Sequence, residues 1–356
     1  MNQNILMYDY LVDYLNAVAP YLSSELVNPR ILSRIKKISR TLKPTWGAFL
    51  KCPLGEDNST VNFSIHALSN AIKLPAKMLP ISSLKREREQ LQSIHNCCMR
   101  SRLSEEIGSI FLDFELNQDG AEIPIPSIFF NLQEGDLQCL NGDIGTFCTW
   151  LIKKVVEPLN NRTIPSYLQK NLELSLTALP TEAQVLELGT MQPSPLDSIQ
   201  LSISGMSPLA ICEYLTNIGW RGSIVELEKL ALFLDNIVDA IVIKVELGIT
   251  VAPQVSFGCF IYQDLYKDCS WQPLFDFMIE NKLCTPKKYA ALLNWSGLSY
   301  EKYSPMPWPA NLKIISDFLG NRASSILVRE VSHIEITYIQ NQLDAKAHLW
   351  FSPDWD

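Results

Sequence analysis

Histidine, lysine and glutamate residues recur on the polar faces of stretches that alternate polar and apolar residues, as β-strands do. Three of the four histidines, His66, His333 and His348, fall on such faces. We expect His333 and His348 on the two strands of one hairpin, formed by residues 332–339 and 344–351. Imidazole groups placed in this way are suited to proton transfer, hydrogen bonding or metal binding.

Lysines and acids on the same faces complete the charged candidates. The lysines are Lys51, Lys244 and Lys346, and the acids are Asp113, Glu115, Glu246 and Glu335. They could bind charged groups and move protons. An ordinary interpretation is that Lys244 with Glu246, or Lys346 beside Glu335, forms a charge pair on a hydrated face, worth less than about 1 kcal/mol.

Two further alternatives concern the histidines. His66 taken alone is more typical of a hydrogen-bonded structural histidine than of a functional one. A metal site built from His333, Glu335 and His348 is chemically possible. Its spacing matches no recognised motif, so the sequence assigns no metal ligands.

The strands that carry these residues are predicted to form five hairpins. They lie near residues 46–66, 107–132, 184–204, 237–261 and 332–351. Residues 107–132 and 237–261 repeat one design, in which an apolar strand with two late polar positions leads through a glycine turn to a return strand. Such repetition indicates an architecture built from copies of one unit.

Helical patterns separate the hairpins. We predict helices within residues 5–39, 83–102, 145–159, 167–172, 208–220, 223–234, 272–280, 286–294 and 309–319. Ten strands with one apolar and one polar face need helices on the first face and a hydrated space on the second. An α+β fold follows, a ten-stranded antiparallel β-barrel of αββα units with its helices outside. The alternative is two separate α+β sandwiches.

The length of 356 residues suits one large domain or two medium ones. We predict an N-terminal helical segment, residues 1–40, that packs on a barrel domain of residues 41–356. The net charge of −8 argues against a nucleic-acid partner, and no apolar run reaches the roughly 20 residues that span a membrane. The nine scattered cysteines and the absence of a signal-peptide pattern predict reduced thiols in a cytoplasmic protein.

The repeated helix–strand–strand–helix units resemble the ABBA prenyltransferases, which close five such units into a ten-stranded barrel. The resemblance covers about residues 40–352 and lies in the pattern rather than in a short motif. That superfamily includes indole and aromatic prenyltransferases and the cyanobactin enzymes that prenylate peptides, which we take as the nearest group. The resemblance implies transfer of an isoprenyl group from its diphosphate to a peptide side chain or an aromatic small molecule, with Mg²⁺ as an optional cofactor.

The resemblance also implies roles for residues on the polar strand faces. Lys51, Lys244 and Lys346 would hold the diphosphate with His66 and His348, and Phe49, Phe111, Phe129 and Trp350 would shield the allyl cation. Glu115, Glu246, Glu335 or His333 would accept the proton, with Asp113 as a further candidate. The sequence departs from the family because no arginine falls on a predicted strand and Lys-x-Tyr pairs are missing. Alternatives are therefore a non-enzymatic barrel that binds a peptide or partner protein, and a different, metal-dependent enzyme in the same barrel.

Overall fold

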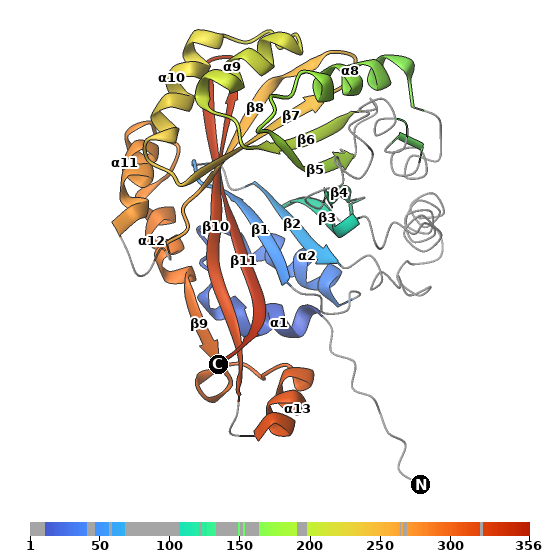
Figure 1. Ribbon diagram of the computed structural model, residues 1–356. Coiled ribbons are helices and arrows are strands. Elements are labelled where there is room, and N and C mark those ends of the chain that lie inside the picture. The colour runs from blue at the N-terminus through green and yellow to red at the C-terminus, as the bar shows by residue number, and fades with distance from the viewer. Residues whose placement is uncertain are drawn as a thin grey trace.

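The computed structural model shows a barrel of β-strands with helices around it (Figure 1). The described residues are 11–40, 47–56, 59–67, 107–120, 123–124, 126–132, 149, 152–153, 164–190, 198–263, 265, 269–320 and 323–356. The predicted helix at 83–102 and most of the one at 145–159 lie outside these residues.

Ten antiparallel strands form a closed barrel, as predicted. In spatial order they are β11 (Gln342–Trp355), β1 (Gly47–Pro53), β2 (Thr60–Ala67), β3 (Ile107–Asn117), β4 (Ser127–Leu132), β5 (Gln184–Thr190), β6 (Ile199–Ser204), β7 (Ala240–Leu247), β8 (Val251–Phe260) and β10 (Ser325–Ile339). The barrel closes because β11 pairs with both β1 and β10, which rules out two separate sandwiches.

Helices cover the outside of the barrel. They are α1 (Leu11–Val18), α2 (Pro29–Ser39), α8 (Ser166–Thr177), α9 (Pro208–Asn217), α10 (Ile224–Asp235), α11 (Gln272–Glu280), α12 (Pro286–Trp295) and α13 (Ala310–Leu319). Their starts follow the sequence signals: Ser207, Ser223 and Thr285 cap α9, α10 and α12 by accepting a backbone N–H at the third helical position. Proline occupies the first turn of α9 and α12, where no intrahelical partner is lost.

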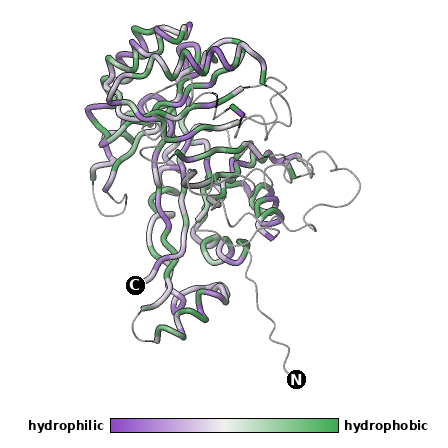
Figure 2. The backbone as a smooth tube through the Cα atoms, turned by 45° about the vertical axis from the view of Figure 1, so that its right-hand side comes forward, coloured by the Kyte–Doolittle hydropathy of each residue, from purple (hydrophilic) through white to green (hydrophobic). Residues whose placement is uncertain are grey.

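The hydrophobic core lies between the helices and the outer face of the barrel. Alternate strand residues such as Leu50, Phe63, Ile243 and Ile336 are buried against it. This period of two agrees with the alternation of hydrophobic and hydrophilic residues along the chain (Figure 2). The other face of every strand points into the barrel, where the polar residues gather.

The closing hairpin is longer than predicted. β10 begins at Ser325 rather than at residue 332, and β11 continues to Trp355. A register shift between Val331 and His333 breaks the alternation that the prediction relied on. The added part of β10 pairs with a short strand that the sequence did not reveal, β9 (Gly297–Tyr300).

The N-terminal helices pack on the barrel, α1 against β10 and α2 against β2 and β3. The boundary at residues 40 and 41 stays a prediction. None of the described helices has the length and apolar composition needed to cross a membrane. The described cysteines, Cys52, Cys212, Cys259, Cys269 and Cys284, are free thiols.

Candidate functional site

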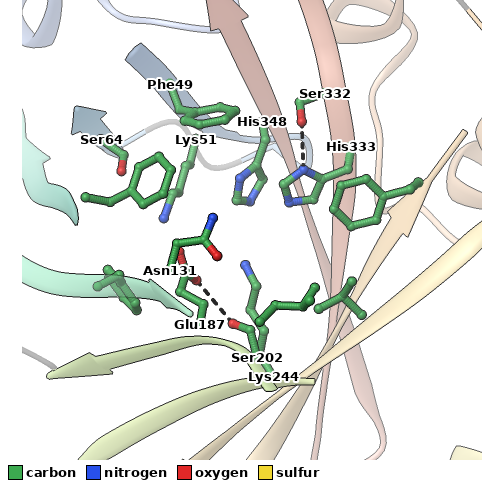
Figure 3. Close-up of a pocket in the computed structure, with 15 residues that line it drawn as sticks. Phe49, Lys51, Ser64, Asn131, Glu187, Ser202, Lys244, Ser332, His333 and His348 are labelled. Atoms are coloured by element: carbon green, nitrogen blue, oxygen red, sulfur yellow. Dashed lines mark hydrogen bonds between the residues drawn. The ribbon is translucent and has the colours of Figure 1, made fainter. Parts of the chain in front are cut away.

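The polar faces of the strands enclose a cavity of about 300 Å³ inside the barrel (Figure 3). Its wall combines aromatic, charged, polar and aliphatic side chains, of which the aliphatic ones are Leu186 and Val242. The aromatic ones are Phe49, Phe111, Phe129 and Phe260; the charged or basic ones are Lys51, Lys244, Glu187, His333 and His348; and the small or polar ones include Ser64, Ser202, Ser332 and Asn131. A ligand bound in this cavity would contact aromatic rings and charged groups at the same time.

Two β-bulges give the cavity more side chains than regular strands would supply. Consecutive residues of a strand normally point to opposite faces. At the shift between Val331 and His333, however, both Ser332 and His333 line the cavity, and at the shift after Val185 both Leu186 and Glu187 do so. Bulges are common beside functional sites because they redirect a side chain in this way.

A first ion pair joins Lys51 on β1 to Asp113 on β3. Their Nζ and Oδ2 atoms lie 2.5 Å apart, across β2, where the small residue Ser64 leaves room. Burial alone would lower the pKa of Lys51, but the neighbouring Asp113 carboxylate outweighs it and raises the pKa. The ammonium group also lies 5.3 Å from the centre of the Phe129 ring, within cation–π range.

A second ion pair joins Lys244 on β7 to Glu335 on β10, and it repeats this arrangement. The Nζ and Oε2 atoms lie 2.5 Å apart across β8, where Ser256 and Gly258 stand opposite the two residues. Burial alone would raise the pKa of Glu335, but Lys244 and then His348 outweigh it and hold the pKa well below its usual value. Lys244 therefore pairs with Glu335, and Glu246 instead accepts a hydrogen bond from Gln254.

The two imidazoles pack against each other beside the second ion pair. His333 and His348 are cross-strand partners with ring centres 3.9 Å apart, and the Phe260 ring stacks on His333 at 4.4 Å. Burial lowers the pKa of His348 to about 4, although Glu335 acts in the opposite direction. Burial, followed by the neighbouring His348 and Lys244, lowers the pKa of His333 well below its ordinary value. Both imidazoles are therefore neutral at pH 7.

The charges around the cavity are nearly balanced. Among the described residues that line it or contact its lysines, two cations (Lys51 and Lys244) face three acids (Asp113, Glu187 and Glu335), a sum of −1. An anionic ligand must therefore compete with the carboxylates for the ammonium groups.

The structure brings most of the predicted residues together. Lys51, Lys244, His333, His348, Phe49, Phe111 and Phe129 line the cavity. Glu335 contacts Lys244, Asp113 contacts Lys51, and Trp350 packs on Phe49 with ring centres 4.4 Å apart.

Other predicted residues lie elsewhere. Lys346 is the cross-strand partner of Glu335 and does not line the cavity. Glu246 lies outside the lining too, and Glu115 is exposed. His66 is placed in β2, but its side chain is outside the described part of the structure.

Sequence reasoning missed several lining residues. Phe260 and Ser202 could have been found by extending the polar-face register of β8 and β6. Glu187 and Ser332 could not, because each depends on a bulge that the sequence pattern does not reveal.

The expectation that no arginine lies on a strand is wrong, because β10 includes Arg329. This arginine serves the outer packing. Its guanidinium donates to Ser299 Oγ at 3.0 Å and to the carbonyl oxygens of Trp295 and Leu298, and it stacks 3.6 Å from the ring centre of Tyr21. It does not line the cavity.

Comparisons by sequence find no match, since no protein-family model fits the chain and no curated protein matches it significantly. Comparisons by structure do find matches. A 6-dimethylallyltryptophan synthase from Micromonospora olivasterospora, in complex with DMASPP and Trp, aligns over 96% of this chain and 96% of its own, with TM-score 0.52 and 10% identity.

Two further solved structures have the same architecture. AnaPT from Neosartorya fischeri aligns over 96% of this chain and 92% of its own, with TM-score 0.50 and 11% identity. Another 6-dimethylallyl tryptophan synthase aligns over 98% and 97%, with TM-score 0.53 and 8% identity. At such identities the likeness shows the fold, so the chain has the ten-stranded barrel of the ABBA prenyltransferases.

Proposed function

We propose that this barrel transfers an isoprenyl group from its diphosphate to an aromatic acceptor. The observation that carries the proposal is the composition of one cavity, where two lysine ammonium groups and four phenylalanine rings face the same space (Figure 3). The fold supports it, because a similar barrel is solved with DMASPP and Trp.

The diphosphate would bind between Lys51 and Lys244. Loss of the allylic C–O bond leaves the bonding electron pair on the diphosphate, and cations placed there stabilise that developing charge. Binding would draw the ammonium groups away from Asp113 and Glu335, their present partners. Lys346 lies outside the cavity lining and could contribute only from a distance.

The allyl cation would form against the aromatic wall. Phe49, Phe111, Phe129 and Phe260 offer π-faces and exclude water. The acceptor ring would donate an electron pair to form the new bond and then lose a proton. Glu335, released from Lys244, or neutral His333 would take that proton, because both lie beside the cavity, whereas Glu115 and Glu246 do not.

The cavity volume favours small substrates. About 300 Å³ is at the lower end of the roughly 300–1,000 Å³ that is usual for ligand pockets. We therefore propose a dimethylallyl donor and a single aromatic ring system as the acceptor. That ring could belong to a free small molecule or to one side chain of a ribosomal peptide, as in the cyanobactin enzymes.

Donor binding is tested by calorimetric titration with the unreactive thio analogue of dimethylallyl diphosphate, with and without Mg²⁺. We expect Lys51→Met and Lys244→Met each to weaken binding by about 10- to 100-fold, the effect of one charge-assisted hydrogen bond. The control is Lys229→Met, which removes an exposed lysine on α10. Equal affinity in all four proteins, or no binding, would exclude this donor site.

Acceptor choice is tested by incubation with dimethylallyl diphosphate and either tryptophan or short peptides that contain aromatic residues. Mass spectrometry should detect an acceptor that has gained one dimethylallyl group. The near-balance of charges around the cavity favours a second candidate, a barrel that binds an uncharged or cationic ligand without chemistry. That candidate is supported if a peptide binds while the diphosphate analogue does not.

A further inference from the structure

We propose that His333, Glu335 and His348 form a binding site for one divalent transition-metal ion in the wall of the barrel. This inference does not rest on the proposed prenyl transfer, since metal binding can be measured without any isoprenyl donor. It rests on the geometry of the closing hairpin and on the contacts that three of its side chains make.

The hairpin brings the three side chains together on one face. His333 and His348 are directly opposed across the antiparallel pair of β10 and β11. Glu335 lies two residues beyond His333 on the same strand, so it points to the same side. Potential ligand atoms of the three residues all lie within 4.8 Å of one another. Two cross-strand residues and an i+2 neighbour thus make a triangle of two nitrogens and one carboxylate.

One ring nitrogen of His348 faces the carboxylate of Glu335. This Nε2 atom is buried, and the Glu335 carboxylate beside it is not placed to form a regular hydrogen bond. It lies 3.3 Å from Glu335 Oε2, close to the spacing of about 3.4 Å between two ligands of a tetrahedral ion with bonds near 2.1 Å. An unsatisfied buried nitrogen costs free energy, so its presence calls for an explanation. A metal ion bound to Nε2 of His348 would explain it, because the ion would accept the lone pair of this nitrogen.

His333 also has one ring nitrogen that a metal ion could bind. Its Nδ1 atom lies 3.2 Å from Ser332 Oγ, in a hydrogen bond that leaves Nε2 for a ligand. Metal-bound histidines usually have such a partner on the second nitrogen, which fixes the ring orientation. The bulge at Val331 and His333 is what turns Ser332 toward the same side. The ring of Phe260 stacks on the other side of the imidazole.

The donor set selects the kind of ion. Two imidazole nitrogens and one carboxylate suit Zn²⁺, Fe²⁺, Co²⁺ or Ni²⁺, whereas Mg²⁺ prefers oxygen ligands. Three protein ligands leave at least one coordination position open. Because His333 and His348 line the cavity, that position would face the lumen and could take water or an oxygen of a bound ligand.

Lys244 competes with the ion, and this gives a decisive test. The Nζ atom of Lys244 lies 2.5 Å from Oε2 of Glu335, one of the proposed metal ligands. A metal ion must displace it, so removal of the ammonium by Lys244→Met should strengthen metal binding. The same substitution should weaken binding of the diphosphate analogue. The two effects have opposite signs, so failure of the metal site and failure of the donor site can be told apart.

The experiment uses the full chain, stripped with EDTA and titrated with Co²⁺, followed by calorimetry and visible absorption. We expect about one ion per chain, with no competing effect of Mg²⁺. Glu335→Gln and His348→Asn should weaken binding by about 100-fold or more, because even outer-shell partners are worth roughly 10–100-fold. Ser332→Ala should weaken it by about tenfold.

Ser202→Ala is the matched control for Ser332→Ala. It removes another cavity hydroxyl, one that contacts Glu187 and not the cluster. Circular dichroism and melting curves establish which variants are folded. If a ligand variant does not fold, the comparison of Ser332→Ala with Ser202→Ala still tests the proposal. The proposal is overturned if Co²⁺ does not bind, if Ser332→Ala and Ser202→Ala bind it equally in folded protein, or if Lys244→Met weakens it.

Discussion

The most informative residues of the lumen are the acids that neutralise its lysines. Asp113 is buried, and one of its oxygens holds Lys51 at 2.5 Å while the other, Oδ1, makes no hydrogen bond among the described residues. A lysine held in this way is a weaker anion site than a free one, because the incoming anion must replace a contact that already exists. The acids therefore lower the affinity of the lumen for anionic ligands.

Asp113→Asn tests this. The amide keeps the shape of the carboxylate and removes its charge, so Lys51 becomes available and the cavity loses one negative charge. We expect the diphosphate analogue to bind about fivefold more tightly, or about 1 kcal/mol, as measured by calorimetry. The folded state should lose stability, on the order of 3 kcal/mol in denaturant unfolding, because a buried ion pair is broken. Weaker analogue binding in this variant would argue against Lys51 as a diphosphate ligand.

At the scale of single elements, glycine and serine residues in the strands decide where the cavity is open. A Cβ atom on Gly189 of β5 would stand 2.1 Å from Cδ1 of Phe129, so the ring of that phenylalanine lies directly on the glycine. Gly47 receives the Trp350 ring in the same way, at 2.2 Å. These glycines let large rings lie flat against the wall instead of filling the lumen.

Gly189→Ala should push the Phe129 ring into the cavity. We expect a loss of about 1–3 kcal/mol of stability from overpacking and weaker binding of the dimethylallyl analogue. Thermal melting and calorimetry measure the two effects. Gly55→Ala is the control, since a Cβ atom there meets nothing within 4 Å. An unchanged affinity in Gly189→Ala would mean that Phe129 does not border the bound donor.

The same scale shows what the sequence could and could not predict. Alternation of polar and apolar residues predicted all five hairpins, because each strand has one face in the helix-covered core. It failed at the bulges in β5 and β10, where the period of two is interrupted, and at the four-residue strand β9. The juxtaposition of His333 and His348 was predictable because a hairpin sets its own register.

Ion pairs that span an intervening strand of the barrel wall were not predictable in this way. One interpretation of the sequence paired Lys244 with Glu246, its neighbour on the same strand face, yet Lys244 contacts Glu335. Lys51 contacts Asp113. In each case the partner comes from a strand two places away in the barrel, so the contact depends on closure and curvature rather than on local pattern. Long side chains then reach across the intervening serine or glycine.

For the whole molecule, Arg329 ties together segments that are far apart in the sequence. Its guanidinium joins β10 to the end of α12, to β9 and to Tyr21 after α1. Burial lowers its pKa to about 10, which still leaves it charged at pH 7. This arginine is therefore a structural clamp outside the lumen.

Arg329→Met should reduce stability without affecting the lumen. We expect a loss of about 3 kcal/mol, because the carbonyl groups of Trp295 and Leu298 and the hydroxyl of Ser299 would lose the buried guanidinium that donates to them. Denaturant unfolding measures that loss, and the affinity for the diphosphate analogue should stay at the wild-type value. Arg221→Met, at an exposed arginine, is the control for charge. A large change in affinity with unchanged stability would contradict this assignment.

The pairing of β1 with β11 has a consequence for how the chain folds. Ala48 lies opposite Phe351, so strands from the two ends of the described chain must meet before the barrel is complete. Contacts this distant in sequence slow folding. During synthesis at roughly 5–20 residues per second, β1 would wait on the order of tens of seconds for its partner. Until then the growing sheet has two open edges that can pair with other chains, so newly made protein should depend on chaperones far more than the finished barrel does.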